Sequence, residues 1–239
     1  MNRALFNRRV RQLHLWLGLA IGAQVGLWLI SGLFMTWFPI EHVRGEHLRA
    51  EIEPGVLGEI EEFLPAATII QNSEIAAESL SLRMMMDQPV WLVLGDESRV
   101  LIDARTGEKL SPLPEDLAIR QARLSYNGKG DVLSTSFLID PPREYGRPGP
   151  VWRVNFGPEQ AASFYVDASI GEVQAVRTTL WRVFDFMWGL HIMDWSSREN
   201  FNSWWIKMTA SLAVLFFLAG LGLAVLRVNS MISRQRRER

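Results

Sequence analysis

Two long segments of the chain carry no charged side chain: one runs from Leu13 to Phe38 and the other from Met208 to Leu226. A helix rises about 1.5 Å per residue, so about 20 apolar residues cross the hydrocarbon layer of a membrane. We therefore predict transmembrane helices at residues 13–38 and 201–228. The first segment is longer than the apolar part of a signal peptide and precedes no clear cleavage motif, so we expect an uncleaved anchor.

The region between these helices contains an internal repeat. Residues 89–94 (PVWLVL) and 150–155 (PVWRVN) share the pattern P-V-W-x-V, and each is followed by an apolar strand that ends in D-A-x-x-G-E, at residues 103–108 and 167–172. Each copy predicts a β-hairpin in which the Asp side chain folds back onto the turn and the Gly adopts a positive φ. Repetition on this scale indicates a duplicated supersecondary unit.

A helix is predicted before each hairpin, at about residues 65–79 and 113–124. Further strands are expected at residues 81–86 and 132–139, and the Pro- and Gly-rich stretch 140–150 is expected to be a loop. The region is therefore predicted to have an α+β fold that consists of two α-β-β repeats.

The distribution of charge predicts the orientation in the membrane. Both apolar segments are flanked by short basic stretches, which contain Arg3, Arg8, Arg9, Arg11, Arg227, Arg234, Arg236, Arg237 and Arg239. The positive-inside rule then places the tails, residues 1–12 and 229–239, in the cytoplasm. Residues 39–200 carry 25 acidic residues against 15 Lys and Arg, a formal charge of −10, and are expected in the periplasm of a bacterium whose inner membrane holds the helices. The tails are expected to contact lipid headgroups, and no nucleic-acid partner is expected.

Composition then excludes several kinds of chemistry. The absence of cysteine excludes disulfides, Cys-ligated zinc, iron–sulfur clusters, a thiolate nucleophile and covalent attachment of haem. The sequence contains no Ser–His–Asp set, phosphate loop, dinucleotide fingerprint or zinc-protease motif. Any enzymatic activity would need an outside electron donor, and the sequence leaves open whether the chain is an enzyme.

The histidines are the candidate cofactor ligands. At a spacing of four residues, His14 shares one helix face with Gly18, Gly22 and Gly26. One interpretation is a stripe of small residues for close helix packing. The other is a haem site, in which the imidazole binds the iron and the porphyrin lies over the glycines. The residues alone do not decide between the two.

His191 lies in an aromatic stretch that predicts an interfacial helix at about residues 178–195. It is either a cofactor ligand or a polar residue of the aromatic belt at the membrane surface. His14 and His191 are expected on opposite membrane faces, so a haem with two histidine ligands requires a second protein, most simply a second copy of the chain. His42 and His47 are five residues apart, a poor helical spacing for a shared metal, and are not expected to bind one.

Polar and small residues within the two apolar segments predict helix contacts. Gln24, Ser31 and Thr36 are expected to form hydrogen bonds across helices. Phe216, Gly220 and Ala224 share a face of the second helix and are expected to meet the glycine stripe of the first. These contacts would bring the two membrane helices together.

Residues 11–19 (RQLHLWLGL) resemble the start of the first membrane helix in the PepSY-associated transmembrane family. The two repeats, at about residues 60–110 and 111–177, resemble PepSY domains, and the resemblance covers nearly the whole chain. It implies non-covalently bound haem b held by membrane histidines, as in inner-membrane reductases for siderophore-bound iron. Leu190-His191 matches a family position, so the resemblance implies a metal-binding role for both His14 and His191. Larger members have four membrane helices where this chain has two.

Two classes of function remain open at this point. The first is a haem-binding electron-transfer component of the inner membrane that serves metal or siderophore reduction in iron uptake, with a homodimer as one arrangement. The second is a non-enzymatic PepSY binding or regulatory module with a periplasmic protein partner, or an accessory subunit of a larger membrane complex.

Overall fold

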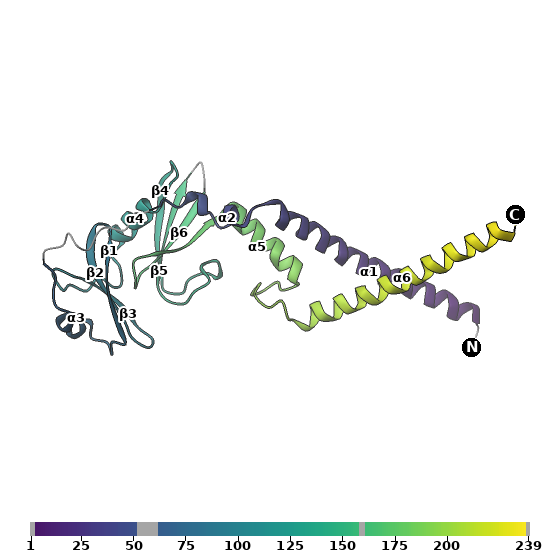
Figure 1. The fold of residues 1–239 in the computed structure, drawn as a ribbon, viewed down its shortest axis with the longest axis horizontal. Helices are drawn as coiled ribbons and strands as arrows, with labels where there is room; N and C mark the ends of the chain where they lie inside the picture. Colours follow the sequence, from purple (N-terminus) through teal and green to yellow (C-terminus); the bar gives the residue numbers. More distant parts are fainter. Residues whose placement is uncertain (1–2, 52–61, 158–160, 238–239) are drawn as a thin grey trace. The chain divides into compact units, whose positions relative to one another are not determined.

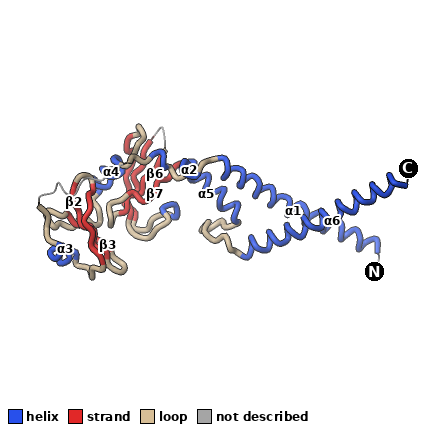
Figure 2. The backbone as a smooth tube through the Cα atoms, in the orientation of Figure 1, coloured by secondary structure: helices blue, strands red, loops and turns tan. Residues whose placement is uncertain are grey.

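The computed structural model describes residues 3–51, 62–157 and 161–237 (Figure 1). The chain divides into two compact units. The helical unit comprises Met1–Phe38 and Val183–Arg239, and the sheet unit comprises Pro39–Arg182. Figure 2 shows that helix dominates the first unit, whereas strands and loops make up most of the second.

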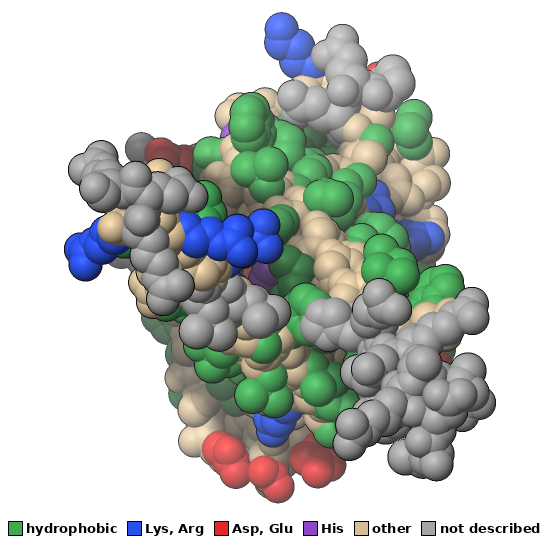
Figure 3. Space-filling model, turned by 90° about the vertical axis from the view of Figure 1, so that its right-hand side faces the viewer, with side chains coloured by type: hydrophobic (Ala, Val, Ile, Leu, Met, Phe, Trp, Pro, Cys, Tyr) green, Lys and Arg blue, Asp and Glu red, His purple; other side chains and the backbone are tan. Residues whose placement is uncertain are grey.

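The helical unit contains α1 (Arg3–Trp37), α6 (Trp204–Arg237) and most of α5 (Thr179–Ile192). Within α1 and α6, residues Leu15–Trp37 and Trp204–Arg236 are long and apolar enough to cross a membrane, at the positions that the sequence predicts. Both helices continue into the basic tails, so the described parts of these tails are helical. Large apolar side chains are exposed along both helices, and hydrophobic side chains cover much of the face shown in Figure 3.

The sheet unit begins with short helical turns and contains two antiparallel sheets. The turns are α2 (Ile40–Val43) and η1 (Glu46–Leu48). The first sheet has the order β1-β2-β3, and the second has the order β4-β5-β6-β7. Their strands are β1 (Ser79–Met85), β2 (Gln88–Leu94), β3 (Arg99–Asp103), β4 (Asp131–Leu138), β5 (Val151–Gly157), β6 (Ala162–Asp167) and β7 (Val173–Thr178). Helix α3 (Ala66–Ser73) packs on the first sheet and α4 (Glu115–Leu124) on the second.

The α+β fold and both predicted hairpins are confirmed, with two differences. The first helix ends at Ser73 rather than near residue 79, because Glu74 adopts a positive φ of 60° and the following segment approaches β2. There the N–H of Glu78 donates to the carbonyl of Leu94 at 2.8 Å. Strand β7 is absent from the sequence-based prediction.

Both repeats form their turn with the same set of hydrogen bonds. The carboxylate of Asp103 accepts the N–H groups of the second and third residues after it, at 2.8 Å each, and Asp167 does the same at 2.8 and 3.2 Å. In each turn the Asp N–H donates to the carbonyl of the Glu five residues later, at 2.9 Å. Gly107 and Gly171 have φ of 75° and 69°, so the glycine of the motif supplies the left-handed backbone, as predicted.

Each turn is also tied to the helix of its own repeat. The N–H of Leu64, just before α3, donates to the carbonyl of Ala104 at 2.7 Å. The N–H of Leu113, just before α4, donates to the carbonyl of Ala168, also at 2.7 Å. A Leu-Pro pair thus precedes each helix, and the N–H of its Leu bonds to the carbonyl of the Ala in the D-A-x-x-G-E motif. The repeat is therefore longer than the hairpin that reveals it in the sequence.

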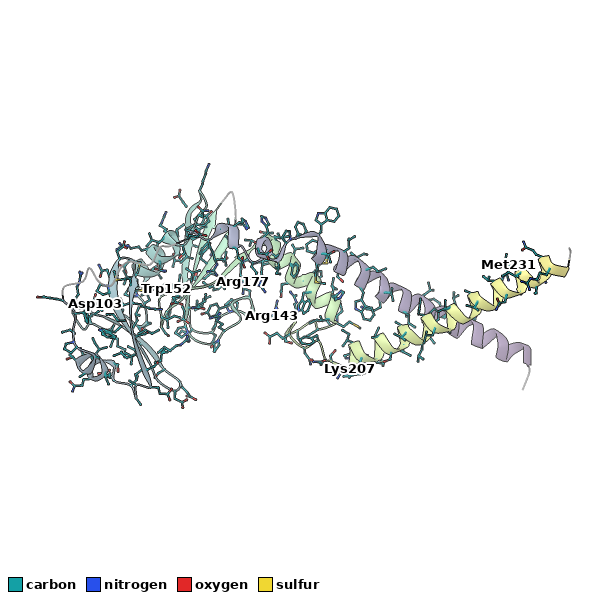
Figure 4. All side chains as sticks on the ribbon, viewed as in Figure 1. Asp103, Arg143, Trp152, Arg177, Lys207 and Met231 are labelled. Carbon is teal, nitrogen blue, oxygen red and sulfur yellow. The ribbon has the colours of Figure 1, made fainter. Side chains whose placement is uncertain are left out.

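The two repeats share one hydrophobic core. A single buried cluster includes Val90 and Leu101 from the first repeat and Phe156 and Phe164 from the second. Trp152, labelled in Figure 4, packs against this cluster and its Nε1–H donates to the carbonyl of Leu113 at 2.7 Å. The repeats therefore fold as one body, in which the second turn is covered by the first sheet.

Because the first sheet covers only the second turn, Asp167 and Asp103 have different surroundings. Asp167 is 3 % exposed and lies 3.4 Å from the guanidinium of Arg99, and the hydroxyl of Tyr145 donates to it at 3.4 Å. Asp103 is only partly buried. Burial, followed by the interaction with Asp167, raises the pKa of Tyr145 to about 12. One carboxylate thus closes a turn and joins the repeats, while the other closes a turn only.

The loop 140–150 is held to the second sheet through Glu144. Arg182 donates to its carboxylate at 2.8 and 3.1 Å, and the hydroxyl of Tyr165 donates to the same group. Burial alone would raise the pKa of Glu144, but these hydrogen bonds outweigh it and lower the pKa. Burial, together with the bond to Glu144, raises the pKa of Tyr165 to about 12. The predicted loop is therefore an ordered part of the sheet unit.

The repeat supplies a matched pair of substitutions. Asp103→Ala removes the turn hydrogen bonds alone and should lower the free energy of unfolding by about 1 kcal/mol. Asp167→Ala also leaves Arg99 and Tyr145 without this partner and should cost about 2–3 kcal/mol, since the buried hydroxyl of Tyr145 loses its acceptor and Arg99 loses an ion pair. Thermal unfolding of the full chain in detergent, followed by circular dichroism, measures the difference. Equal losses in the two variants would contradict this account of the core.

Candidate functional site

The ring of His191 lies against α1 inside the helical unit. Its Nδ1 is 3.0 Å from the hydroxyl oxygen of Ser31, a contact between helices that supports the prediction for Ser31. A Cβ placed on Gly32 would lie 3.5 Å from Cε1 of the ring, so this glycine borders the imidazole. Ser31 stands six residues before Trp37, the last residue of the first apolar span, which corresponds to about 9 Å along the helix. The histidine therefore lies beside a residue within the span rather than beyond its end.

The hydroxyl of Ser31 contacts a backbone carbonyl of its own helix as well as the ring of His191. Ser31 is 1 % exposed, and its hydroxyl donates to the carbonyl of Leu27 at 2.7 Å. A hydroxyl has one hydrogen, so the contact with His191 uses the lone pair of Ser31 as the acceptor. We therefore assign the proton of a neutral His191 to Nδ1. The lone pair on Nε2 then has no hydrogen-bond partner among the described residues.

Helix α5 is fixed by contacts on both sides of His191. Phe184 lies 6.5 Å from Phe34 of α1, between ring centres. Arg198, in the segment that follows α5, forms an ion pair with Asp185, and its carbonyl accepts the Nε1–H of Trp188 at 2.9 Å. These bonds tie α5 to the segment that leads to α6, so the imidazole is held by a rigid helix.

Asp194 organises that same connecting segment. Its carboxylate accepts backbone N–H groups of Ser196, Ser197, Glu199 and Asn200 and both serine hydroxyls. Hydrogen bonding, first from Ser197 and then from Asn200, holds the pKa of Asp194 well below its usual range. Lys207, labelled in Figure 4, lies in the first turn of the second span, which begins at Trp204.

The glycine stripe is only partly open. A Cβ on Gly18 would lie 3.1 Å from Cζ of Phe216, so α6 covers this position, as predicted for Phe216. Nothing described lies within 4 Å of a Cβ built on Gly22, Gly26 or Gly220. Gly22 and Gly26 thus remain accessible, whereas the expected contact of Gly220 is not found among the described atoms. The hydroxyl of Thr36 donates within its own helix, to Leu33 at 2.9 Å, and not across helices.

His14 belongs to α1, but its side chain lies outside the described residues. Its backbone is 17 residues before Ser31, which is about 26 Å along the helix. Two ligands of one iron lie within about 2 Å of the metal, as metal–nitrogen bonds require. His14 and His191 of the same chain therefore cannot bind the same iron.

His42 and His47 come together in the sheet unit, contrary to what their spacing suggests. Their rings stack with centres 3.9 Å apart and planes 8° from parallel. The chain leaves the helical conformation between α2 and η1, where Gly45 has a φ of 73°, and this turn brings the rings together. Stacked rings direct their lone pairs along parallel planes, and no set of three His, Asp or Glu residues in the described part of the chain is placed to hold a metal ion. The expectation that this pair binds no metal stays a prediction.

The residues around His191 have the chemistry that a haem ligand needs. Histidines that bind metals commonly fix one ring nitrogen through a hydrogen bond and present the other to the metal, and the Ser31 contact has this form. The indole N–H of Trp28 is buried and has no partner among the described residues, and Trp28 and Gly32 share one face of α1. The site therefore fits a histidine that binds haem iron, and the indole N–H of Trp28 is a further hydrogen-bond donor on the same face of α1.

In comparisons with known proteins, no protein-family model matches the chain, and no match is found among curated proteins or solved structures.

The stacked histidines give a prediction for the pH response. Burial, and to a smaller extent the charge of His42, lower the pKa of His47 below its ordinary value of 6.5. A lowered histidine pKa means that the neutral ring stabilises the fold above pH 6.5, and that this stabilisation is lost as the pH falls through the folded-state pKa. An NMR titration of labelled imidazoles in the full chain should show His47 titrating below 6.5, and His42→Ala should raise its pKa part of the way back. Titration of His47 above this value would contradict the stacked arrangement.

Proposed function

We propose that the chain is an inner-membrane, haem-binding electron-transfer protein in which His191 is one of the iron ligands. The observation that carries the proposal is the 3.0 Å contact between Nδ1 of His191 and the hydroxyl oxygen of Ser31, since a proton on Nδ1 would leave Nε2 to bind the iron. Resemblance to the PepSY-associated transmembrane family, stated above on residues 11–19 and the two repeats, supports the same assignment. Two helices long and apolar enough to cross a membrane support the location, with both termini in the cytoplasm and the sheet unit in the periplasm.

Each residue of the site has a separate task in this proposal. Ser31 keeps the proton on Nδ1 and thereby orients the ring. The contacts of α5 hold the ring against α1, and the apolar helices exclude water. Gly22 and Gly26 leave room beside α1 on the face that begins at His14. A bound b-type haem would supply a one-electron carrier with non-covalent attachment, which a chain without cysteine requires.

A second copy of the chain completes the proposed sites. Since His14 lies about 26 Å along α1 from Ser31, the residue that His191 contacts, the two histidines of one chain cannot share an iron, and each would pair with the same residue of a partner chain. A homodimer would then hold two haems, one near each membrane face, and electrons would cross the membrane between them. Metal ions or siderophore-bound iron in the periplasm are the acceptors that the family resemblance implies.

A binding module is the second candidate, and strand β4 favours it. This strand forms one edge of the second sheet, and Leu133, Phe137 and Ile139 at or beside it are 67, 40 and 73 % exposed. An exposed apolar edge is a common site for pairing with another protein. The PepSY-like region would then bind a periplasmic protein, and the helices would serve as an anchor.

Absorption spectra of the purified full chain test the haem proposal. We expect a Soret band and, from the pyridine haemochrome, about one haem per chain, falling to about half in either His14→Ala or His191→Ala. Ser31→Ala should weaken haem binding by about tenfold, because the ring loses its orienting partner. Thr36→Ala is the matched control, since its hydroxyl bonds only within α1, and Ser31→Thr should restore binding.

Two results would overturn the proposal. One is the absence of a Soret band after haem is supplied during expression. The other is an unchanged spectrum in the His14→Ala, His191→Ala double variant. His42→Ala should leave the spectrum unchanged in every case, because the stacked pair is not part of the proposed site.

A further inference from the structure

A groove in the sheet unit lies between its first and last segments. Its volume is about 590 Å³, and residues from 44–51 and 174–181 line it. The side chains that determine its chemistry are Arg44, Arg49, Arg177, Glu46, Glu51 and Trp181. Figure 4 labels Arg177, which comes from β7, the edge strand of the second sheet. Three guanidinium groups in one groove stand out in a region whose formal charge is −10.

Two of the arginines are held in place before any ligand binds. The guanidinium of Arg177 lies 4.2 Å from the ring centre of Trp181, and its Nε donates to the carbonyl of Glu144. Arg49 donates to the carbonyl of Val173 at 3.2 Å, and its partial burial lowers its pKa, although Glu46 acts in the opposite direction. Fixed guanidinium groups bind phosphate or carboxylate with less loss of side-chain entropy than mobile ones.

Chain connectivity limits the distance between this groove and the first apolar span. Arg44 follows Phe38 by six residues, which reach at most about 20 Å. Anionic headgroups lie at that level of a membrane, and tryptophan and arginine are suited to it. A peptide strand is a poorer fit, because Arg49 already occupies the Val173 carbonyl of β7 and Gly45 lies against Val176.

We propose that this groove binds the phosphate of an anionic phospholipid headgroup at the outer surface of the membrane. The inference rests on the membrane location proposed above and is independent of haem. The guanidinium groups would contact the phosphate, and Trp181 would lie at the level of the headgroup. Glu46 and Glu51 would favour a headgroup with hydroxyl donors, such as glycerol.

Native mass spectrometry of the full chain in neutral detergent, with equal amounts of phosphatidylglycerol and phosphatidylcholine, tests the proposal. Wild type should prefer phosphatidylglycerol, and the Arg44→Gln, Arg49→Gln double variant should lose about tenfold of that preference, as loss of charge-assisted hydrogen bonds predicts. Arg105→Gln, Arg120→Gln is the matched control, since these arginines lie outside the groove. The basic tails are present in every variant, so the difference reports on the groove.

A further variant and competing ligands distinguish the proposed lipid from other occupants of the groove. Arg44→Glu alone changes an exposed side chain, so its loss of preference would support the proposal even if the double variant failed to fold. Equal binding of the two lipids by wild type would overturn the proposal. So would an equal preference for phosphatidylglycerol in wild type, the Arg44→Gln, Arg49→Gln variant and the Arg44→Glu variant. Displacement of the lipid by inorganic phosphate at the same concentration would assign a free-anion site instead, and displacement by an acidic peptide a protein partner. Haem content and resistance to alkaline extraction from membranes, measured on the same samples, separate failure here from failure of the proposed function.

Discussion

The hydrogen bond between Ser31 and His191 joins α1 to α5 within the helical unit. A polar ring among apolar helices needs a partner, and the hydroxyl of Ser31 is the partner that the structure provides. Because that hydroxyl also bonds to the backbone of its own helix, the ring, its proton and α1 are fixed together. The aromatic contacts of α5 and the Asp194-centred segment then hold the histidine in this position. The orientation of the ring is thus a property of the whole helical unit.

The sheet unit shows how a duplicated motif acquires two roles. Both turns use the same backbone hydrogen bonds, and both are tied to a helix through a Leu-Pro pair. The surroundings differ, because the second turn is covered by the first sheet and the first turn is not. One shared core follows from that cover, so the two repeats depend on each other for burial of Leu101 and Phe164.

Sequence patterns predicted much of the fold, because most of it is local. The hairpins follow from the alternation of strands and the D-A-x-x-G-E turn, and the spans follow from uninterrupted apolar residues. The first helix was predicted too long, since residues 74–78 have helical propensity but the chain leaves the helix at Glu74 and Glu78 bonds to Leu94 of β2. Strand β7 has six residues with weak alternation, so no local signal identifies it. At the candidate site, His191 and a cross-helix role for Ser31 were predicted separately. Their contact, like the stacking of His42 on His47, depends on tertiary packing that spacing does not reveal.

The burial of Asp167 has a consequence for how the two repeats diverge. Asp167 contacts both Arg99 and Tyr145, so the effects of substitutions at these three positions are expected to be non-additive, and the group spans both repeats. Asp103 has no such group, and only its own turn limits which residues replace it. Drift after the duplication is therefore expected to be asymmetric. The first turn can exchange its residues or accept an insertion, whereas the second changes only when its partners change with it.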